Sequence, residues 1–189
     1  MRKTLGLAAL AAVLACGGAN AQQVNVKIGV LSDMSSLYAD IGGPGSVAAA
    51  KLAIADFTKD HPNVKVEMIS GDHQNKPDIG SQIANQWYDV DKVDMIIDVP
   101  NSGVALAVSN VTNNKNKVFI VSGAAASDLT GAKCNANTVH WTYDTWMLAN
   151  GTGTAMVKTG GDSWFFLTSD CVRPRARTRH SGRSREGGR

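Results

Sequence analysis

Two short loops carry the groups best suited to hold a small polar ligand. Asn101-Ser102-Gly103 follows one apolar run, and Ser122-Gly123-Ala124-Ala125-Ala126-Ser127 follows the next. Small residues let backbone N–H groups approach a ligand, serines add hydroxyl groups, and the start of a following helix favours an anion such as a carboxylate. Tyr38, Trp141 and Tyr143 could add aromatic walls, although ordinary packing explains any one of them equally well. The two loops therefore predict a site for a small solute.

Catalysis is a weaker interpretation of the same serines. The sequence contains no G-x-S-x-G turn, and no histidine stands at a predicted strand end near Ser102, Ser122 or Ser127 to act as a base. These hydroxyl groups are better explained as hydrogen-bond donors to a ligand. We therefore predict no catalytic residues.

The histidines and the glycine-rich stretch do not form a metal or nucleotide motif. Neither H-x-x-x-H nor H-E-x-x-H occurs, and His73 beside Asp72 is more simply a pair of polar loop residues. Gly42-Gly43-Pro44-Gly45 begins about ten residues after the first predicted strand, too far for a dinucleotide fingerprint, and no G-x-x-x-x-G-K-[ST] occurs. We predict no metal site and no cofactor.

Strand and helix patterns alternate along the part of the chain that must position the two loops. Runs rich in β-branched and apolar residues predict four strands, at Val24–Leu31, Val64–Ile69, Val93–Val99 and Val118–Val121. Helices are predicted between them, at Ser46–Phe57 with Ser46 as its N-cap, at Asp78–Tyr88 and at 103–112. This alternation predicts an α/β fold, a parallel sheet flanked by helices. Ligands of such sheets bind beyond the carboxyl ends of the strands, where both loops lie.

Three further elements are expected after the fourth strand. Thr138–Thr142 fits a short strand or an extended crossover, and Asp144–Lys158 fits a helix interrupted by Gly151 and Gly153. Ser163–Thr168 fits another strand, with which a new βα unit is expected to begin.

Residues 1–21 have the pattern of a cleavable signal peptide. Arg2 and Lys3 precede an apolar run, and Ala19-Asn20-Ala21 is an A-x-A cleavage site. The apolar run is too short to span a bilayer. A lipoprotein signal ending at Cys16 is a weaker alternative, because Leu14 stands where a small residue is usual. We predict export of the mature chain.

The charge of the chain divides sharply near its end. Residues 22–170 contain ten lysines, no arginine, fourteen aspartates and one glutamate, which gives a net charge of −5. Such an acidic body argues against nucleic acid or an anionic membrane as a partner. Residues 171–189 contain seven arginines and almost no apolar side chains, so we predict that this tail is disordered. Cys134 is the one cysteine outside the signal peptide and the tail, which excludes a disulfide scaffold and a zinc site.

Four segments together resemble the periplasmic substrate-binding proteins of ABC transporters, in the branch that binds leucine, isoleucine and valine. They are VKIGVLSDMSSLYADIGGPGSVAAAKLAIADF, MIIDVPNSGVALAVSNV, FIVSGAAASDLTG and NTVHWTYDTWMLANGTGTAMV, and the resemblance covers about residues 24–170. It implies the N-terminal lobe of a type I periplasmic-binding fold. Proteins of this family have two α/β lobes that close on a small solute and then dock on a membrane permease, and they have no catalytic residues.

The resemblance also implies which residues contact the solute. In the family, the loops after the third and fourth strands hold the carboxylate and the amino group of an amino acid, and an aromatic residue of the first loop often lies against it. The candidate ligand-binding residues in this chain are Tyr38, Asn101, Ser102, Gly103, Ala124, Ala126, Ser127 and Tyr143.

The family pattern predicts a division of the chain and a break in it. We expect a signal peptide at 1–21, an N-terminal lobe at 22–140, one helix and one strand of a second lobe at 141–170, and an unrelated tail at 171–189. Relatives typically have Tyr-x-x-Gly, with a ligand-facing Tyr, where Cys171 stands here. Synonymous codons for the tail exist that, read from the second base, give Ala-Phe-Gly followed by an amphipathic helix, and a Tyr before this stretch would complete the motif. We therefore predict a frameshift after Asp170, with most of the second lobe missing.

The predicted function is that of a monomeric periplasmic component that binds an amino acid or a similar small carboxylate or amide for delivery to a permease. Without a second lobe the cleft cannot close, so we expect this chain to bind its solute weakly or not at all. One alternative is the ligand-sensing domain of a receptor with the same fold. Another is an exported hydrolase, which would require a histidine or carboxylate beside Ser102 or Ser127. The sequence does not name the solute.

Overall fold

The computed structural model describes residues 22–165, and the predicted signal peptide and arginine-rich tail lie outside this range. Five parallel strands form one sheet in the order β2-β1-β3-β4-β5. Their bounds are β1 Val24–Ser32, β2 Val64–Asp72, β3 Met95–Asp98, β4 Val118–Val121 and β5 Thr138–His140. The predicted parallel α/β sheet is confirmed, and Thr138–His140 is a strand that extends it.

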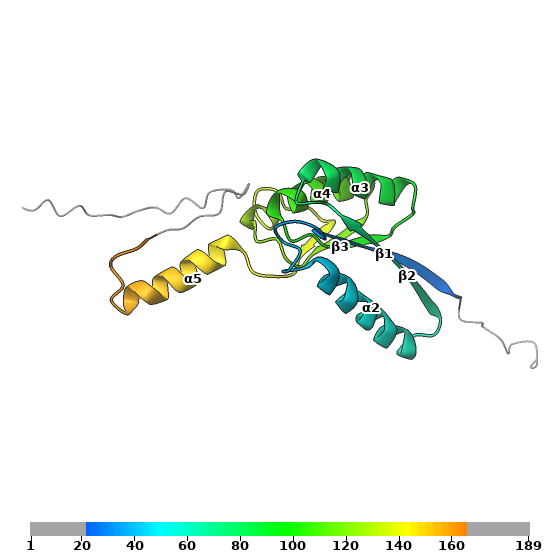
Figure 1. Ribbon diagram of the computed structural model, residues 1–189, viewed down its shortest axis with the longest axis horizontal. Coiled ribbons are helices and arrows are strands. Elements are labelled where there is room, and N and C mark those ends of the chain that lie inside the picture. The colour runs from blue at the N-terminus through cyan, green and yellow to red at the C-terminus, as the bar shows by residue number, and fades with distance from the viewer. Residues whose placement is uncertain (1–21, 166–189) are drawn as a thin grey trace, which may run out of the picture.

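Helices cover the two faces of the sheet unequally. Their bounds are α2 Gly43–Asp60, α3 Pro77–Asp89, α4 Ser102–Lys115 and α5 Thr145–Lys158, with a 3-10 turn η1 at Ser127–Leu129. Helices α3 and α4 lie on one face and α2 lies on the other (Figure 1). Gly43 is the one buried residue of α2. The main core therefore lies between the sheet and the α3–α4 pair.

Most residues of this core come from the three central strands and the two covering helices. Leu31, Ile96, Phe119 and Val121 project from the sheet, and Trp87, Val104 and Val108 meet them from the helices. Full burial of one such side chain stabilises the fold by about 1.5–3 kcal/mol. This packing fixes the carboxyl ends of β1, β3 and β4 relative to one another.

Several predicted boundaries are wrong. Helix α2 begins at Gly43 with Gly42 as its N-cap, so Ser46 lies inside the helix and is not the cap. Strand β3 begins at Met95 and not at Val93, because pairing with β1 starts where Met95 meets Ile28.

Helix α5 is continuous through Gly151 and Gly153, contrary to the predicted interruption. An interior glycine costs about 1 kcal/mol relative to alanine, which a helix of 14 residues can absorb. The Asp144 side chain also caps α5 by accepting a hydrogen bond of 2.7 Å from the Met147 amide.

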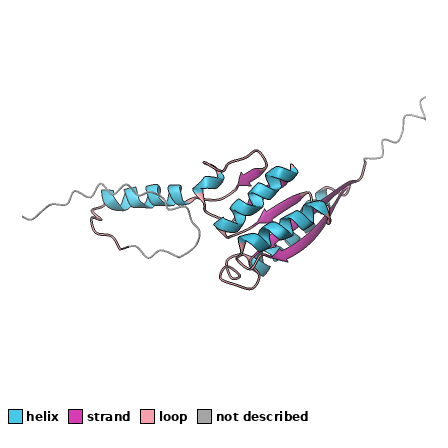
Figure 2. Cartoon of the chain, turned by 90° about the horizontal axis from the view of Figure 1, so that it is seen from above, coloured by secondary structure: helices cyan, strands magenta, loops and turns pink. Residues whose placement is uncertain are grey.

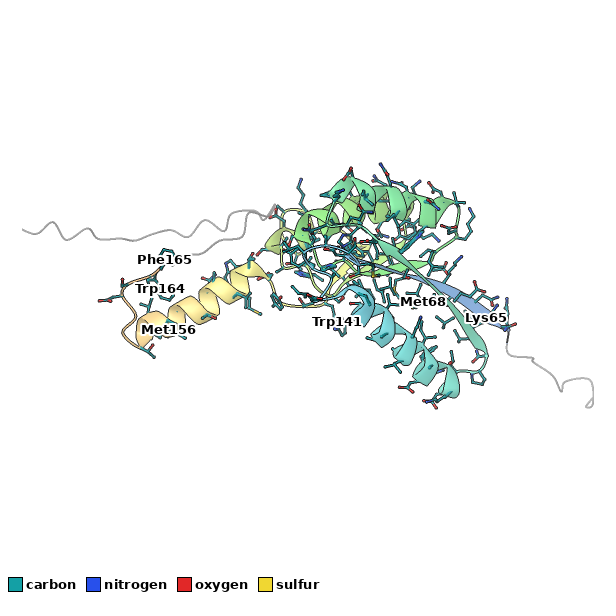
Figure 3. The ribbon with its side chains drawn as sticks, in the orientation of Figure 1. Lys65, Met68, Trp141, Met156, Trp164 and Phe165 are labelled. Atoms are coloured by element: carbon teal, nitrogen blue, oxygen red, sulfur yellow. The ribbon has the colours of Figure 1, made fainter. Side chains whose placement is uncertain are left out.

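Helix α5 projects away from the sheet, as Figure 2 shows from a second direction. Figure 3 shows Trp141 in the connection from the sheet, and Met156 and Trp164 at the far end of the helix. No residue of α5 is buried. The predicted strand Ser163–Thr168 does not form at residues 163–165, which have no regular structure, and its remainder lies outside the described residues.

None of the helices within residues 22–165 combines the length and the apolar character that crossing a membrane requires.

Candidate functional site

The order in which the chain adds strands to the sheet reverses between β1 and β3. From β1 the chain crosses to β2 on one side, and from β2 it returns to β3 on the other side of β1. Open α/β sheets bind ligands at such a point, so we expect the ligand crevice between the carboxyl ends of β1 and β3. Leu31 of β1 is paired with Asp98 of β3 at this edge.

The loop after β1 is held by a buried carboxylate. Asp33 accepts hydrogen bonds from the Ser36 hydroxyl at 2.6 Å and from the Ser36 and Tyr38 amides at 2.9 Å. Burial alone would raise the pKa of Asp33, but these hydrogen bonds from Ser36 and the backbone outweigh it and hold that pKa below its usual value. The fixed loop positions Tyr38, a predicted ligand contact, whose side chain is half-buried.

Asp72 and His73 connect the end of β2 to this loop. Asp72 accepts from the Met34 amide at 2.9 Å and from the Ser35 hydroxyl at 2.6 Å. His73 is fully buried, its Nδ1 accepts from the Asn75 amide, and its Nε2 has no partner among the described residues. Burial lowers the pKa of His73, against the opposing effect of the nearby aspartates. The pair is thus engaged in structural contacts, and within the described range no group of three or more potential ligands could hold a metal ion.

Asp98, at the end of β3, is a candidate site residue that the sequence reasoning missed. Its Oδ1 accepts from the Ser122 hydroxyl at 2.9 Å, while its buried Oδ2 makes no hydrogen bond to any described residue. Asp98 and Val99 have φ angles of +85° and +62°, which side-chain-bearing residues rarely adopt. The one available signal was an aspartate at the end of the apolar run MIID.

The two predicted loops lie against each other. A Cβ at Gly123 would meet the Cα of Pro100 at 3.0 Å, so the loop after β4 contacts the residue that precedes Asn101. Asn101 and Ser102 are buried, and the Asn101 side chain accepts from the Val104 amide at 2.9 Å as the N-cap of α4. Gly103 is half-buried in the first turn of the same helix.

The loop after β4 uses its groups mainly for structure. Ala124 and Ala126 are fully buried, and the Ala124 carbonyl is 2.6 Å from His140 Nε2. Ser127 Oγ is 3.0 Å from Thr145 Oγ1 and accepts from the Trp146 amide at 3.1 Å. The alanine side chains are thus part of the core, which leaves only their backbone groups for a ligand.

The aromatic candidates of the second half are exposed. Trp141 is 75% exposed and Tyr143 is 48% exposed. Neither aromatic side chain is packed against the described residues as a buried wall of the site would be. Ser127 bonds Thr145 and Trp146, not a histidine or carboxylate, so the described residues do not pair it with a base.

A separate shallow hollow of about 520 Å³ lies between the start of α2 and the end of β2. None of the predicted ligand-binding residues lines it. Its walls are Met34, Pro44, Val47, Ala48, Lys51, Ser70, Gly71 and Asp72. The crevice between β1 and β3 remains the better candidate because the two polar loops and the unpartnered carboxylate oxygen converge there.

Comparisons with known proteins give a consistent result. Residues 25–182 match a family model described as periplasmic binding protein. A crystal structure of a periplasmic binding protein from Burkholderia mallei is 46% identical, with a TM-score of 0.71, and the match covers 77% of this chain and 39% of that one. No curated protein matches the sequence. The matched range runs beyond Asp170, and the frameshift there stays a prediction.

Two further structures are similar. A branched-chain amino acid ABC transporter periplasmic ligand-binding protein from Burkholderia xenovorans is 39% identical, with a TM-score of 0.70, and the match covers 78% of this chain and 39% of that one. A solute binding protein from R. palustris in complex with benzoate is 23% identical, with a TM-score of 0.62, over 72% of this chain and 38% of that one, which shows likeness of fold alone. The chain spans about two fifths of the length of each of these structures.

Proposed function

The chain belongs to the periplasmic binding protein family, and we propose that it is part of the periplasmic solute-binding component of an ABC transporter. The proposed solute is an amino acid or a similar small carboxylate or amide, which the component delivers to a membrane permease. The similar protein from Burkholderia xenovorans carries the corresponding description, which supports this role.

One observation carries the proposal to particular residues. The loops after β3 and β4 touch at Pro100 and Gly123, beside the crevice between β1 and β3. The N-terminus of α4, with Asn101 and Ser102, lies in the first of these loops and suits a carboxylate. The backbone of residues 124–126 and Tyr38 are the further proposed contacts.

The affinity of this chain for its solute is expected to be low, because the chain spans only part of the length of its relatives. Two-lobed binding proteins gain affinity by closing around a ligand, and the chain covers 39% of the length of its Burkholderia mallei relative. We expect one lobe to contact a solute from one side only. Binding by the chain as given is therefore expected to be weak or absent.

Isothermal titration calorimetry and a thermal-shift screen test this proposal together. The 189-residue chain without its first 21 residues is titrated with leucine, phenylalanine, short amides and benzoate, and no tight binding is expected. Resequencing the gene across Asp170 comes next. If another frame continues the family pattern, the restored protein is screened with the same compounds and is expected to be stabilised by one solute class. Tight binding by the short chain overturns the expectation of weak binding, and no stabilisation of the restored protein by any compound counts against the transport role.

A further inference from the structure

Helix α5 has an apolar surface that the rest of the described chain does not cover. None of its 14 residues is buried. Lys158 is the one charged residue of the helix. Its five large apolar side chains are between 46% and 65% exposed, namely Trp146, Met147, Leu148, Met156 and Val157. A helix without a charged face is typical of a buried element, so we expect another surface to cover α5.

The segment that follows the described range is poorly suited to cover this helix. Residues 166–189 contain seven arginines, and their large apolar side chains are Phe166, Leu167 and Val172. A guanidinium group packed on an apolar helix would lose water without gaining a partner of opposite charge. We therefore looked for a cover in a second copy of the chain.

One face of α5 is complementary to itself. Trp146, Ala149, Gly153 and Met156 recur at spacings of three and four residues, which places them along one side of the helix. Large side chains stand at both ends of this face and small residues at its centre. A Cβ at Gly153 would meet no atom within 4 Å, so the centre is open. A two-fold interface requires such symmetry, because the same patch meets itself.

An antiparallel pair of α5 helices matches this face residue by residue. Trp146 of each copy meets Met156 of the other, and a thioether sulfur packs favourably against an aromatic ring. Between these two contacts, Ala149 of each copy meets Gly153 of the other. Such small residues let the two helix axes approach to about 8 Å, the short end of the usual range.

The charges at the ends of α5 favour the antiparallel order over the parallel one. Asp144 is the N-cap of the helix and Lys158 is its last residue. An antiparallel pair sets the Asp144 end of one copy beside the Lys158 end of the other, and the opposed helix dipoles add to this attraction. A parallel pair would bring the two aspartates together, and likewise the two lysines.

We propose that α5 is a dimerisation helix, through which two copies of the 189-residue chain associate about a two-fold axis. The family resemblance led us to expect a monomer, and the self-complementary face of α5 favours a dimer instead. A helix of 14 residues is about 21 Å long, so the interface is smaller than a standard one and the dimer is weak. The association does not depend on which solute the chain binds.

Sedimentation equilibrium tests the dimer on the chain from residue 22 to residue 189. A reducing agent is present, so that Cys134 and Cys171 cannot cross-link two copies. We expect a reversible monomer–dimer equilibrium with a dissociation constant on the order of 10–100 μM, as suits a small interface. A monomer at concentrations of about 1 mM overturns the proposal, whether α5 is then left uncovered or is covered by the residues after 165.

Glutamate substitutions locate the interface on α5. W146E and G153E place a charge on the proposed face and are expected to raise the dissociation constant roughly tenfold or more. G151E is the matched control, because Gly151 lies on the opposite side of the same helix and a Cβ there also meets no atom within 4 Å. L52E, at an exposed leucine of α2, is a second control, and both controls are expected to keep the dissociation constant.

The variants are informative because α5 contributes no buried residue, so the sheet is expected to stay folded in all four, which circular dichroism checks. A dimer that survives both W146E and G153E overturns the proposal. So does a dimer that G151E weakens as much as G153E does.

Disulfide trapping tests the order of the two helices. A149C and G153C are each introduced into a chain in which C134S and C171S remove the native thiols, and the two proteins are mixed and oxidised. In the antiparallel pair, position 149 of one copy faces position 153 of the other, so we expect the mixed disulfide to outnumber both homodimers. A predominance of the two homodimers indicates a parallel pair and overturns the antiparallel arrangement.

Discussion

Trp87 of α3 lies directly against the backbone of Gly29 in β1. A Cβ at residue 29 would come within 2.4 Å of indole Cε3 and Cζ3, and one at Gly71 within 2.8 Å of Cζ2. The indole therefore lies over two neighbouring strands at positions where no side chain fits. This contact joins α3 to the half of the sheet that carries the loop after β1.

The first prediction is that G29A destabilises the fold. The added methyl group must displace a buried indole, and overpacking of this kind costs about 1–3 kcal/mol. Gly45 is the matched control, because a Cβ there meets nothing within 4 Å and Gly45 lies in α2. G45A is expected to leave the free energy of unfolding unchanged or to raise it by up to about 1 kcal/mol. Urea unfolding measures both, and equal stability of the two variants would contradict the packing described here.

The second prediction separates the structural role of Asn101 from a role in binding. Its side chain caps α4 by accepting from the Val104 amide, so N101A is expected to lower the free energy of unfolding by about 1 kcal/mol. N101D, which retains a capping oxygen, is expected to keep most of the stability. If N101A unfolds at the same urea concentration as the unaltered chain, the cap contributes nothing and Asn101 is free to act on a ligand alone.

The third prediction concerns Tyr88, whose hydroxyl is 3.0 Å from Thr112 Oγ1 and donates to the Val118 carbonyl at 3.1 Å. Burial raises the pKa of Tyr88 to about 12. Because this pKa lies above the unfolded value of about 10, the stability it contributes is present below pH 10 and is lost as the pH rises through 12. A pH titration followed by tyrosinate absorbance at about 295 nm is expected to show one tyrosine that ionises late, and Y88F is expected to remove that transition. Y88F is also expected to lower the free energy of unfolding by about 1 kcal/mol. Y143F, which alters an exposed tyrosine, is expected to leave that free energy unchanged. A late transition that survives Y88F would rule out the assignment.

The order of elements was readable from the sequence because strand and helix patterns have different periods. The predicted strand Val64–Ile69 lies within β2, and the predicted strand Val118–Val121 matches β4. The boundaries were less predictable. Strand β3 starts where β1 offers a partner, and α5 passes through two glycines that local propensity alone would treat as breaks.

The candidate site was predictable in position and not in chemistry. The loops after β3 and β4 were found because small residues and serines follow apolar runs. Burial of Ala124 and Ala126, and the use of Ser127 Oγ at the start of α5, depend on contacts between distant segments. Asp98 escaped notice because its importance comes from an unusual backbone angle and from an oxygen left without a partner, neither of which a residue pattern records.

The fourth prediction is that His73 makes the fold less stable in mild acid. Burial lowers the pKa of His73 below its usual value of about 6.5, so the unfolded chain takes up the proton first as the pH falls. Neutral His73 therefore adds to the free energy of unfolding. This addition is complete above the pKa of His73 in the unfolded chain and is lost as the pH falls through its pKa in the folded chain, with a slope of at most about 1.4 kcal/mol per pH unit. Urea unfolding between about pH 7.5 and 5 measures this slope, because that window lies above the pKa values of about 4 at which carboxylates titrate. H73Q is expected to flatten the slope even if it lowers stability at every pH, whereas H61Q, at an exposed histidine, is expected to leave it as it is. Parallel slopes for the unaltered chain and H73Q would show that His73 takes up its proton equally well in the folded and unfolded states, against the burial seen at the end of β2.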